Sequence, residues 1–144
     1  MISYVAMILT SLILLCAFVF PFEYANKFLI PVLALFVISN IFYVWIIRKD
    51  PGTVKKSSEV SFVKLNKFFE PSFICPTCEI LKPKEARHCY ICNKCIDRFD
   101  HHCQWVDTCI GHDNHSIFYV YLVTIWSYLA LIDFVAITSL NFSL

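Results

Sequence analysis

The sequence predicts an α-helical integral membrane protein, with three transmembrane helices and a cysteine-rich segment between the second and the third. Three observations predict this class. Of the 144 residues, 58% are hydrophobic and only 16% are charged. The apolar residues are concentrated in three long runs, and seven of the eight cysteines lie between the last two runs. The net charge of +1 gives no reason to expect a nucleic-acid partner.

The three apolar runs account for the three predicted spans. Residues 2–20 and 28–47 carry no charge, and each is about as long as the ~20 residues that cross a ~30 Å hydrocarbon core. Residues 117–140 hold a single charge, at Asp133. The first run lacks the charged start and the small-residue cleavage site of a signal peptide. A buried soluble hairpin is the alternative for the first two runs, but so short a chain has too little polar surface to cover three of them.

The basic residues orient the chain. Eleven of the twelve lysines and arginines lie between Arg48 and Arg98, and positively charged loops remain on the cytosolic side of a membrane. Because the cytosol disfavours disulfides, the seven cysteines of this cytosolic segment predict metal binding or catalysis. We find no internal repeat. The predicted order begins with a transmembrane hairpin (1–47), a juxtamembrane linker (48–70) and a metal-binding segment (71–116). A third span (117–140) and a lumenal end (141–144) follow.

The metal-binding prediction rests on the density of ligand residues. From Cys75 to His115 there are seven cysteines and five histidines in 41 residues, within "CPTC", "HCYICNKC" and "HHCQWVDTC". A Cys-x2-Cys turn directs two thiolates at one metal, and a structural zinc site is closed by four ligands. Two such sites would use eight of the twelve candidates. A spare cysteine with a nearby histidine is what a catalytic pair would leave over.

Metal would also solve a folding problem in this segment. Residues 71–116 contain few aliphatic side chains with which to build a core. Zinc binding supplies ~10–16 kcal/mol of folding free energy in small peptides, and here it would replace hydrophobic burial.

The full spacing resembles a known family. It reads Cys-x2-Cys-x9-His-Cys-x2-Cys-x2-Cys-x4-Asp-His-His-Cys-x5-Cys-x4-Asn-x3-Phe, from Cys75 to Phe118. This pattern resembles the cysteine-rich domain of the DHHC protein S-acyltransferases. The "DPG" at Asp50–Gly52, just after the second apolar run, resembles that family's other short motif. The resemblance extends over essentially the whole chain, including the order of the spans.

The resemblance implies which residues bind metal and which do chemistry. One zinc set would be Cys75, Cys78, His88 and Cys95, and the other would be Cys89, Cys92, His102 and Cys109. The spacing alone does not give this interleaved connectivity. Asp100, His101 and Cys103 remain as the implied catalytic residues. His112 and His115 match no ligand position, and we interpret both as polar residues at the membrane surface.

The implied reaction is two-step acyl transfer through Cys103. A cysteine thiol with a pKa of ~8.5 is only a few per cent thiolate at pH 7, so it needs a base. His101 lies two residues away and would take the proton, and Asp100 would orient its imidazole as a triad carboxylate does. Cys103 would then attack the thioester of palmitoyl-CoA and pass the acyl group to a substrate cysteine. Both zinc ions would be structural, because closed sites leave no position for substrate.

The resemblance also implies partners and a location. The partners would be the lipid bilayer, palmitoyl-CoA and proteins with membrane-proximal cysteines. The location would be a membrane of the endomembrane system, either the endoplasmic reticulum, the Golgi or the plasma membrane, with the zinc domain in the cytosol. Self-association and pairing with a homologue both stay open.

One departure from the family pattern leads to an alternative interpretation of the function. The sequence stops at Leu144, before the fourth span and the Thr-Thr-x-Glu motif of the family, and we expect a fragment, a truncated product or part of a split protein. The alternative function is therefore a catalytically incomplete, membrane-anchored zinc module, either a fragment or a regulatory partner of a full-length homologue. Nucleic-acid binding is disfavoured, because residues 75–115 hold five basic and six acidic side chains and no basic patch.

Overall fold

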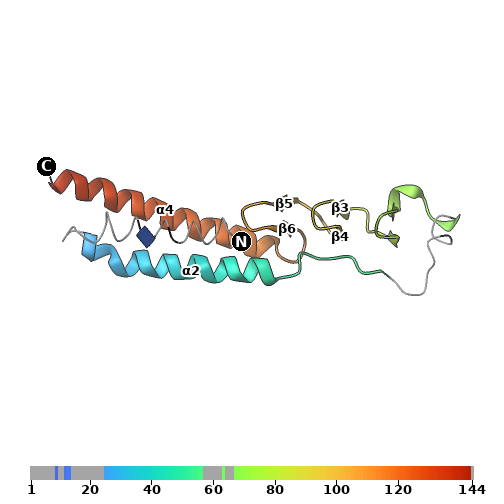
Figure 1. The fold of residues 1–144 in the computed structure, drawn as a ribbon, viewed down its shortest axis with the longest axis horizontal. Helices are drawn as coiled ribbons and strands as arrows, with labels where there is room; N and C mark the ends of the chain where they lie inside the picture. Colours follow the sequence, from blue (N-terminus) through green and yellow to red (C-terminus); the bar gives the residue numbers. More distant parts are fainter. Residues whose placement is uncertain (1–8, 10–11, 14–24, 57–62, 64–66, 144) are drawn as a thin grey trace. The chain divides into compact units, whose positions relative to one another are not determined.

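The computed structural model describes residues 25–56 and 67–143, together with Leu9, Leu12, Ile13 and Val63 (Figure 1). The chain divides into two compact units. One is a helical unit, to which residues 1–45 and 117–144 belong, and the other is a cysteine-rich unit, Ile46–Ser116. Apart from Leu9, Leu12 and Ile13, the predicted first span at residues 2–20 lies outside the described residues.

Two long helices occupy the predicted second and third spans. A short 3-10 helix, η2 (Ala25–Phe28), leads into α2 (Leu29–Arg48), and α4 extends over His115–Ser143. Pro31 falls in the first turn of α2, where a missing N–H costs little, and Pro51 follows the last turn, where it prevents continuation. Leu29–Arg48 and His115–Ser139 are long and apolar enough to cross a membrane.

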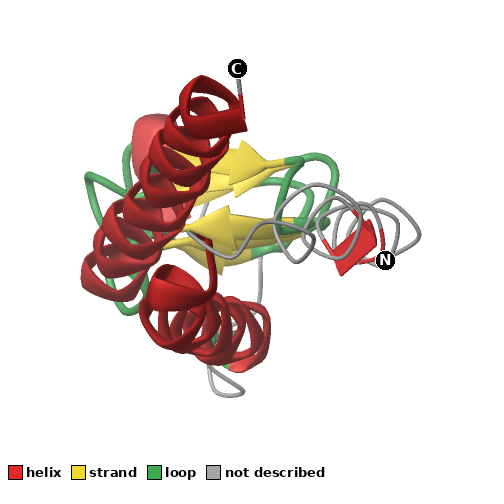
Figure 2. Cartoon of the chain, turned by 90° about the vertical axis from the view of Figure 1, so that its left-hand side faces the viewer, coloured by secondary structure: helices red, strands yellow, loops and turns green. Residues whose placement is uncertain are grey.

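The two helices pack antiparallel. Three ring contacts join η2 and α2 to α4, namely Phe28–Phe134, Phe36–Tyr128 and Tyr43–Tyr121, so that residue numbers rise along η2 and α2 as they fall along α4. Between the rings, Val32 and Val135 are fully buried. Figure 2 shows the two helices lying side by side. Many of their other apolar side chains are exposed, Ile30 by 80% and Ile137 by 60%, as expected for surfaces that lipid would cover.

In the described residues of the cysteine-rich unit, the strands form three antiparallel hairpins (Figure 1). Each strand is only two or three residues long, and the hydrophobic clusters of the hairpins are small, each made of one isoleucine and two cysteines with partly buried neighbours. A 3-10 helix, η3 (Pro71–Phe73), precedes them. The paired strands are β1 (Ile74–Cys75) with β2 (Ile80–Leu81), β3 (Arg87–Cys89) with β4 (Lys94–Ile96), and β5 (His101–Cys103) with β6 (Thr108–Ile110).

The three hairpins repeat one turn. Each turn ends in a non-glycine residue with a positive φ, and these residues, Glu79, Asn93 and Asp107, follow one another at intervals of fourteen. Strand ends recur at the same interval, with Cys75, Cys89 and Cys103 each the last residue before a turn. Our reading that the sequence contains no internal repeat is therefore wrong. The repeat consists of the turn geometry, the cysteines and one histidine, His88 and then His102, while most residues between them differ.

The segment after α2 pairs along the middle hairpin. Thr53 forms a bridge with Ile96, the Val54 N–H donates to the Cys95 carbonyl at 2.8 Å, and the Asp97 N–H donates to the Gly52 carbonyl at 2.8 Å. Gly111 packs closely against this pairing, beside Ile96 and the backbone of Pro51. A Cβ added there would collide with the side chain of Ile96 and would lie 2.5 Å from the Pro51 carbonyl oxygen.

We expect Gly111→Ala to destabilise the cysteine-rich unit by ~1–3 kcal/mol, the usual cost of overpacking. The backbone of Pro51 must move to admit a methyl group, and this would weaken the pairing beside Cys95. The measurement is the apparent melting temperature of the purified chain in detergent. His112→Ala is the control, because His112 is next to Gly111 in the sequence and its side chain is half exposed. Equal melting temperatures for Gly111→Ala and wild type would contradict the expectation.

Candidate functional site

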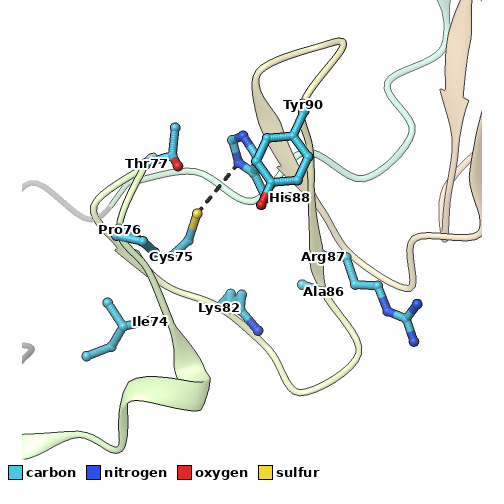
Figure 3. Close-up of a pocket in the computed structure, with 9 residues that line it drawn as sticks. All are labelled: Ile74, Cys75, Pro76, Thr77, Lys82, Ala86, Arg87, His88 and Tyr90. Atoms are coloured by element: carbon cyan, nitrogen blue, oxygen red, sulfur yellow. Dashed lines mark hydrogen bonds between the residues drawn. The ribbon is translucent and has the colours of Figure 1, made fainter.

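The first cluster of ligand residues joins the first two hairpins. The Nδ1 atom of His88 lies 3.2 Å from the Cys78 sulfur, 3.6 Å from that of Cys75 and 3.8 Å from that of Cys95. Figure 3 shows the imidazole directed at Cys75, with the ring of Tyr90 against it. A tetrahedron with zinc–sulfur bonds of ~2.3 Å and zinc–nitrogen bonds of ~2.0 Å would separate its corners by ~3.5–3.8 Å. The spacing of this cluster is close to that.

The second cluster joins the second and third hairpins with nearly the same geometry. The Nδ1 atom of His102 lies 3.3 Å from the Cys92 sulfur, 3.7 Å from that of Cys109 and 3.8 Å from that of Cys89. In each cluster the ligand atoms all lie within 4.8 Å of one another. The structure thus brings together the two sets Cys75, Cys78, His88, Cys95 and Cys89, Cys92, His102, Cys109.

The hairpin register explains why neighbouring residues belong to different clusters. His88 is the cross-strand partner of Cys95, and His102 is that of Cys109, so each pair points to one face of its hairpin. Successive residues of a strand point to opposite faces, so Cys89 points away from His88. Each cluster takes a Cys-x2-Cys turn from one hairpin and a histidine–cysteine pair from the next.

The thiols of each cluster resist ionising together. Burial raises the pKa of Cys95, and the adjacent thiols of Cys75 and Cys78 raise it further. The same two causes raise the pKa of Cys109 in the other cluster. Burial also acts to raise the pKa of Cys89, but backbone N–H groups of its turn, chiefly that of Cys92 at 3.5 Å from the sulfur, lower it overall. A divalent cation would remove the repulsion between the thiolates, and three sulfurs with one imidazole suit zinc chemistry. Both clusters could therefore hold metal ions.

Cys103 lies outside both clusters. It occupies the third hairpin at the position that corresponds to Cys75 and Cys89, the first ligands of their turns. The second ligand position of that turn holds Val106, which is 1% exposed. Among the described cysteines, Cys103 is the one that no cluster includes. It is 5% exposed, and it shares its strand face with His101, since the two alternate about His102.

Asp100 lies between two histidines. Its Oδ2 atom is 3.4 Å from the Nδ1 atom of His101 and 3.6 Å from the Nε2 atom of His115. The sequence predicted Asp100 beside His101, but it gave His115 no role at this site. No spacing signal could have revealed this contact, because it depends on how the segment after β6 turns back to Asp100.

Asn114 makes that turn. It is fully buried, its Oδ1 accepts the Gly111 N–H at 2.9 Å and its Nδ2 donates to the Cys109 carbonyl at 2.9 Å. One side chain thus connects the last ligand of the second cluster to the start of α4. His112, by contrast, pairs with the neighbouring Asp113 at 2.9 Å and belongs to neither cluster.

The Asp-Pro-Gly motif forms a turn held by the Asp50 carboxylate. Its Oδ1 accepts the N–H groups of Gly52 at 2.8 Å and Thr53 at 2.6 Å. The bond from Thr53 is the main cause that lowers the pKa of Asp50. A group whose pKa is lower in the folded chain stabilises folding above its unfolded pKa, and this contribution disappears as the pH falls through the folded value.

We therefore expect Asp50→Asn, which retains an acceptor but loses the charge, to be less stable than wild type at pH 7 by ~0.5–1.5 kcal/mol. The difference should begin to shrink as the pH falls below the unfolded value of ~4, and it should disappear as Asp50 becomes protonated in the folded chain. Both chains share every metal ligand, so metal loss at low pH affects them alike. The measurement is the difference between their denaturation midpoints across pH, and a difference that stays constant down to pH 2 would contradict the assignment.

The comparisons with known proteins agree with this geometry. The family model of the DHHC palmitoyltransferases matches residues 68–143, just over half of the chain. The chain belongs to the DHHC palmitoyltransferase family. The family resemblance that the cysteine and histidine spacing indicated is thereby confirmed.

Individual relatives of this DHHC-family chain are themselves named palmitoyltransferases. Palmitoyltransferase ZDHHC4 of Bos taurus is 36% identical over 107 residues, which cover 72% of this chain and 31% of that protein. Palmitoyltransferase ZDHHC17 of Danio rerio is 42% identical over 100 residues, which cover 66% of this chain and 16% of that protein. The aligned part thus spans a third or less of these relatives.

Proposed function

We propose that this chain is the catalytic part of a protein S-acyltransferase, in which Cys103 carries a long-chain acyl group from acyl-CoA to a cysteine of a protein substrate. One observation carries the proposal: six of the seven described cysteines belong to the two clusters, and Cys103 is left free in the hairpin that the second cluster holds. The name that the relatives share supports palmitoyl transfer in particular.

The proposed chemistry conserves thioester bonds. His101 takes the Cys103 proton, and the thiolate attacks the carbonyl carbon of palmitoyl-CoA. The bond to the CoA sulfur breaks, and CoA leaves with a proton returned by His101. A substrate cysteine then attacks the acyl group on Cys103 and releases the Cys103 thiol. Asp100, 3.4 Å from His101 Nδ1, orients that ring so that Nε2 serves as the base.

The two clusters support this reaction by fixing the chain on both sides of Cys103. We propose that each binds one structural zinc ion, which holds thiolates and an imidazole and takes no part in acyl transfer. Cluster ligands stand on either side of the nucleophile, at His102 and Cys109.

The proposed membrane arrangement follows the predicted domains. Residues 1–47 form a transmembrane hairpin, 48–70 a cytosolic linker, 71–116 the cytosolic zinc domain, 117–140 a third span and 141–144 a lumenal end. The apolar helices α2 and α4 support the second and third spans. The acceptors would be proteins with cysteines near the cytosolic face of an endomembrane, and homo- or hetero-oligomers are compatible with this arrangement.

Autoacylation tests the function. The purified, zinc-loaded chain is incubated in detergent with an alkynyl palmitoyl-CoA, and hydroxylamine-sensitive label is measured. We expect labelling of wild type and of a Cys16→Ser variant, whose substitution lies in the predicted first span, and no labelling of Cys103→Ser. A wild-type chain that holds two zinc ions and takes no label would favour the second candidate, a catalytically incomplete zinc module. Unchanged labelling of Cys103→Ser would refute the assigned nucleophile.

A further inference from the structure

We propose that His115 is a positioning residue for acyl transfer, which holds the Asp100 carboxylate against His101. The inference rests on the proposed function. Its basis is a shared atom, because the same Oδ2 of Asp100 lies 3.4 Å from His101 Nδ1 and 3.6 Å from His115 Nε2. Asp100 thus has an imidazole on each of two sides.

The placement of the three residues is set by backbone contacts. The Asp100 N–H donates to the Ile110 carbonyl at 3.0 Å, which fixes Asp100 to the start of the segment after β6. His115 is the first residue of α4, and its N–H donates to the Gly111 carbonyl at 3.0 Å. Asn114 locks the residues between through its two buried hydrogen bonds. His115 therefore returns to Asp100 as a consequence of the fold.

Two-sided contact matters because the Asp100 side chain is half exposed, at 50%. A carboxylate with one partner at that exposure rotates readily into water, and His101 then loses the group that orients it. His115 restricts that rotation. Both distances exceed those of direct hydrogen bonds, and such contacts commonly shorten once substrate excludes water from the site.

The competing explanation is a surface ion pair with no bearing on chemistry. The chain provides a matched control for it. His112 and Asp113 form another imidazole–carboxylate pair, with side chains 49% and 50% exposed, on the turn just before His115. If His115 acts only as a surface group, the substitutions His115→Ala and His112→Ala should have the same effect.

The experiment measures the reactivity of Cys103 in two ways in the full zinc-loaded chain. The first is the rate of Cys103 alkylation by iodoacetamide, followed on the Cys103 peptide by mass spectrometry. The second is the rate of acyl loading from palmitoyl-CoA. We expect His115→Ala to slow both by about tenfold, less than the ~10² that misplacing a catalytic group can cost. His115→Gln, which retains an N–H donor, should recover most of the rate, and His112→Ala should match wild type.

The outcomes separate the two proposals. Equal rates for His115→Ala, His112→Ala and wild type overturn the role of His115 and leave the acyltransferase intact. Alkylation that depends on His115 in a chain that never takes the acyl label overturns the function and retains the positioning contact. If His115→Ala loses zinc, the comparison passes to His115→Gln against His115→Phe, and equal rates for these two overturn the inference.

Discussion

Removal of metal by a chelator is expected to unfold the cysteine-rich unit, residues 46–116, while α2 and α4 keep their helical structure. The hairpins have strands of two or three residues, and the two clusters join each hairpin to the next. Structural zinc contributes ~10–16 kcal/mol in comparable small units, more than any other interaction described here. Hydrogen exchange with and without chelator measures the effect, with protection lost over residues 74–110 and retained in the helices.

Substitution of single ligands tests the metal binding of each cluster separately. Cys95→Ser should release one equivalent of zinc from the first cluster, and Cys109→Ser should release one from the second. Cys16→Ser is the control, since Cys16 lies in the predicted first span and matches no ligand position of the cysteine and histidine pattern. Retention of two equivalents by both ligand variants, or a chelated chain with full protection over residues 74–110, would contradict the metal assignment.

Asn114→Ala is expected to lower the free energy of unfolding of the cysteine-rich unit by ~2–4 kcal/mol, through a cavity and two unpaired buried backbone groups. The side chain is 0% exposed and bonds both the Gly111 N–H and the Cys109 carbonyl. Because Cys109 is a ligand of the second cluster, that cluster should also release its metal faster than the first. Apparent melting temperature and zinc release to a colorimetric chelator measure the two effects.

Asp113→Ala is the comparison for this substitution, since Asp113 is adjacent but half exposed. Asn114→Asp adds a finer one, because it retains the acceptor for Gly111 and removes the donor to Cys109. We expect it to fall between wild type and Asn114→Ala. A melting temperature of Asn114→Ala equal to that of Asp113→Ala would show that the buried amide contributes little.

The sequence was sufficient for the two long helices that the structure describes and for the ligand types. Apolar runs of the right length predicted α2 and α4 within a few residues, because membrane-length helices leave a strong compositional signal. The hairpins left none, since strands as short as Ile80–Leu81 contain too little alternation to detect. The assignment of His88 and Cys89 to different clusters came from the family resemblance. Strand alternation explains it only once the register is known.

The contact that sequence reasoning missed is tertiary. His115 stands fifteen residues beyond Asp100, and their approach depends on the Asn114 turn and on the Asp100–Ile110 backbone bond. Neither is encoded in a local pattern. The same holds for Gly111, whose need to be glycine comes from Pro51 and Ile96, two distant segments that cross it.

The interleaving of the hairpins orders the two ligand sets along the chain. Synthesis proceeds from the N-terminus, so the first ligand set is complete at Cys95 and the second only at Cys109. Cys103 lies between the two residues that the second set takes from the third hairpin, His102 and Cys109. If each set binds one metal ion, as proposed, a chain that had lost only the second ion would keep the first hairpin joined to the middle one and release the strand that carries Cys103. The reactivity of Cys103 would then report on the occupancy of the second site alone.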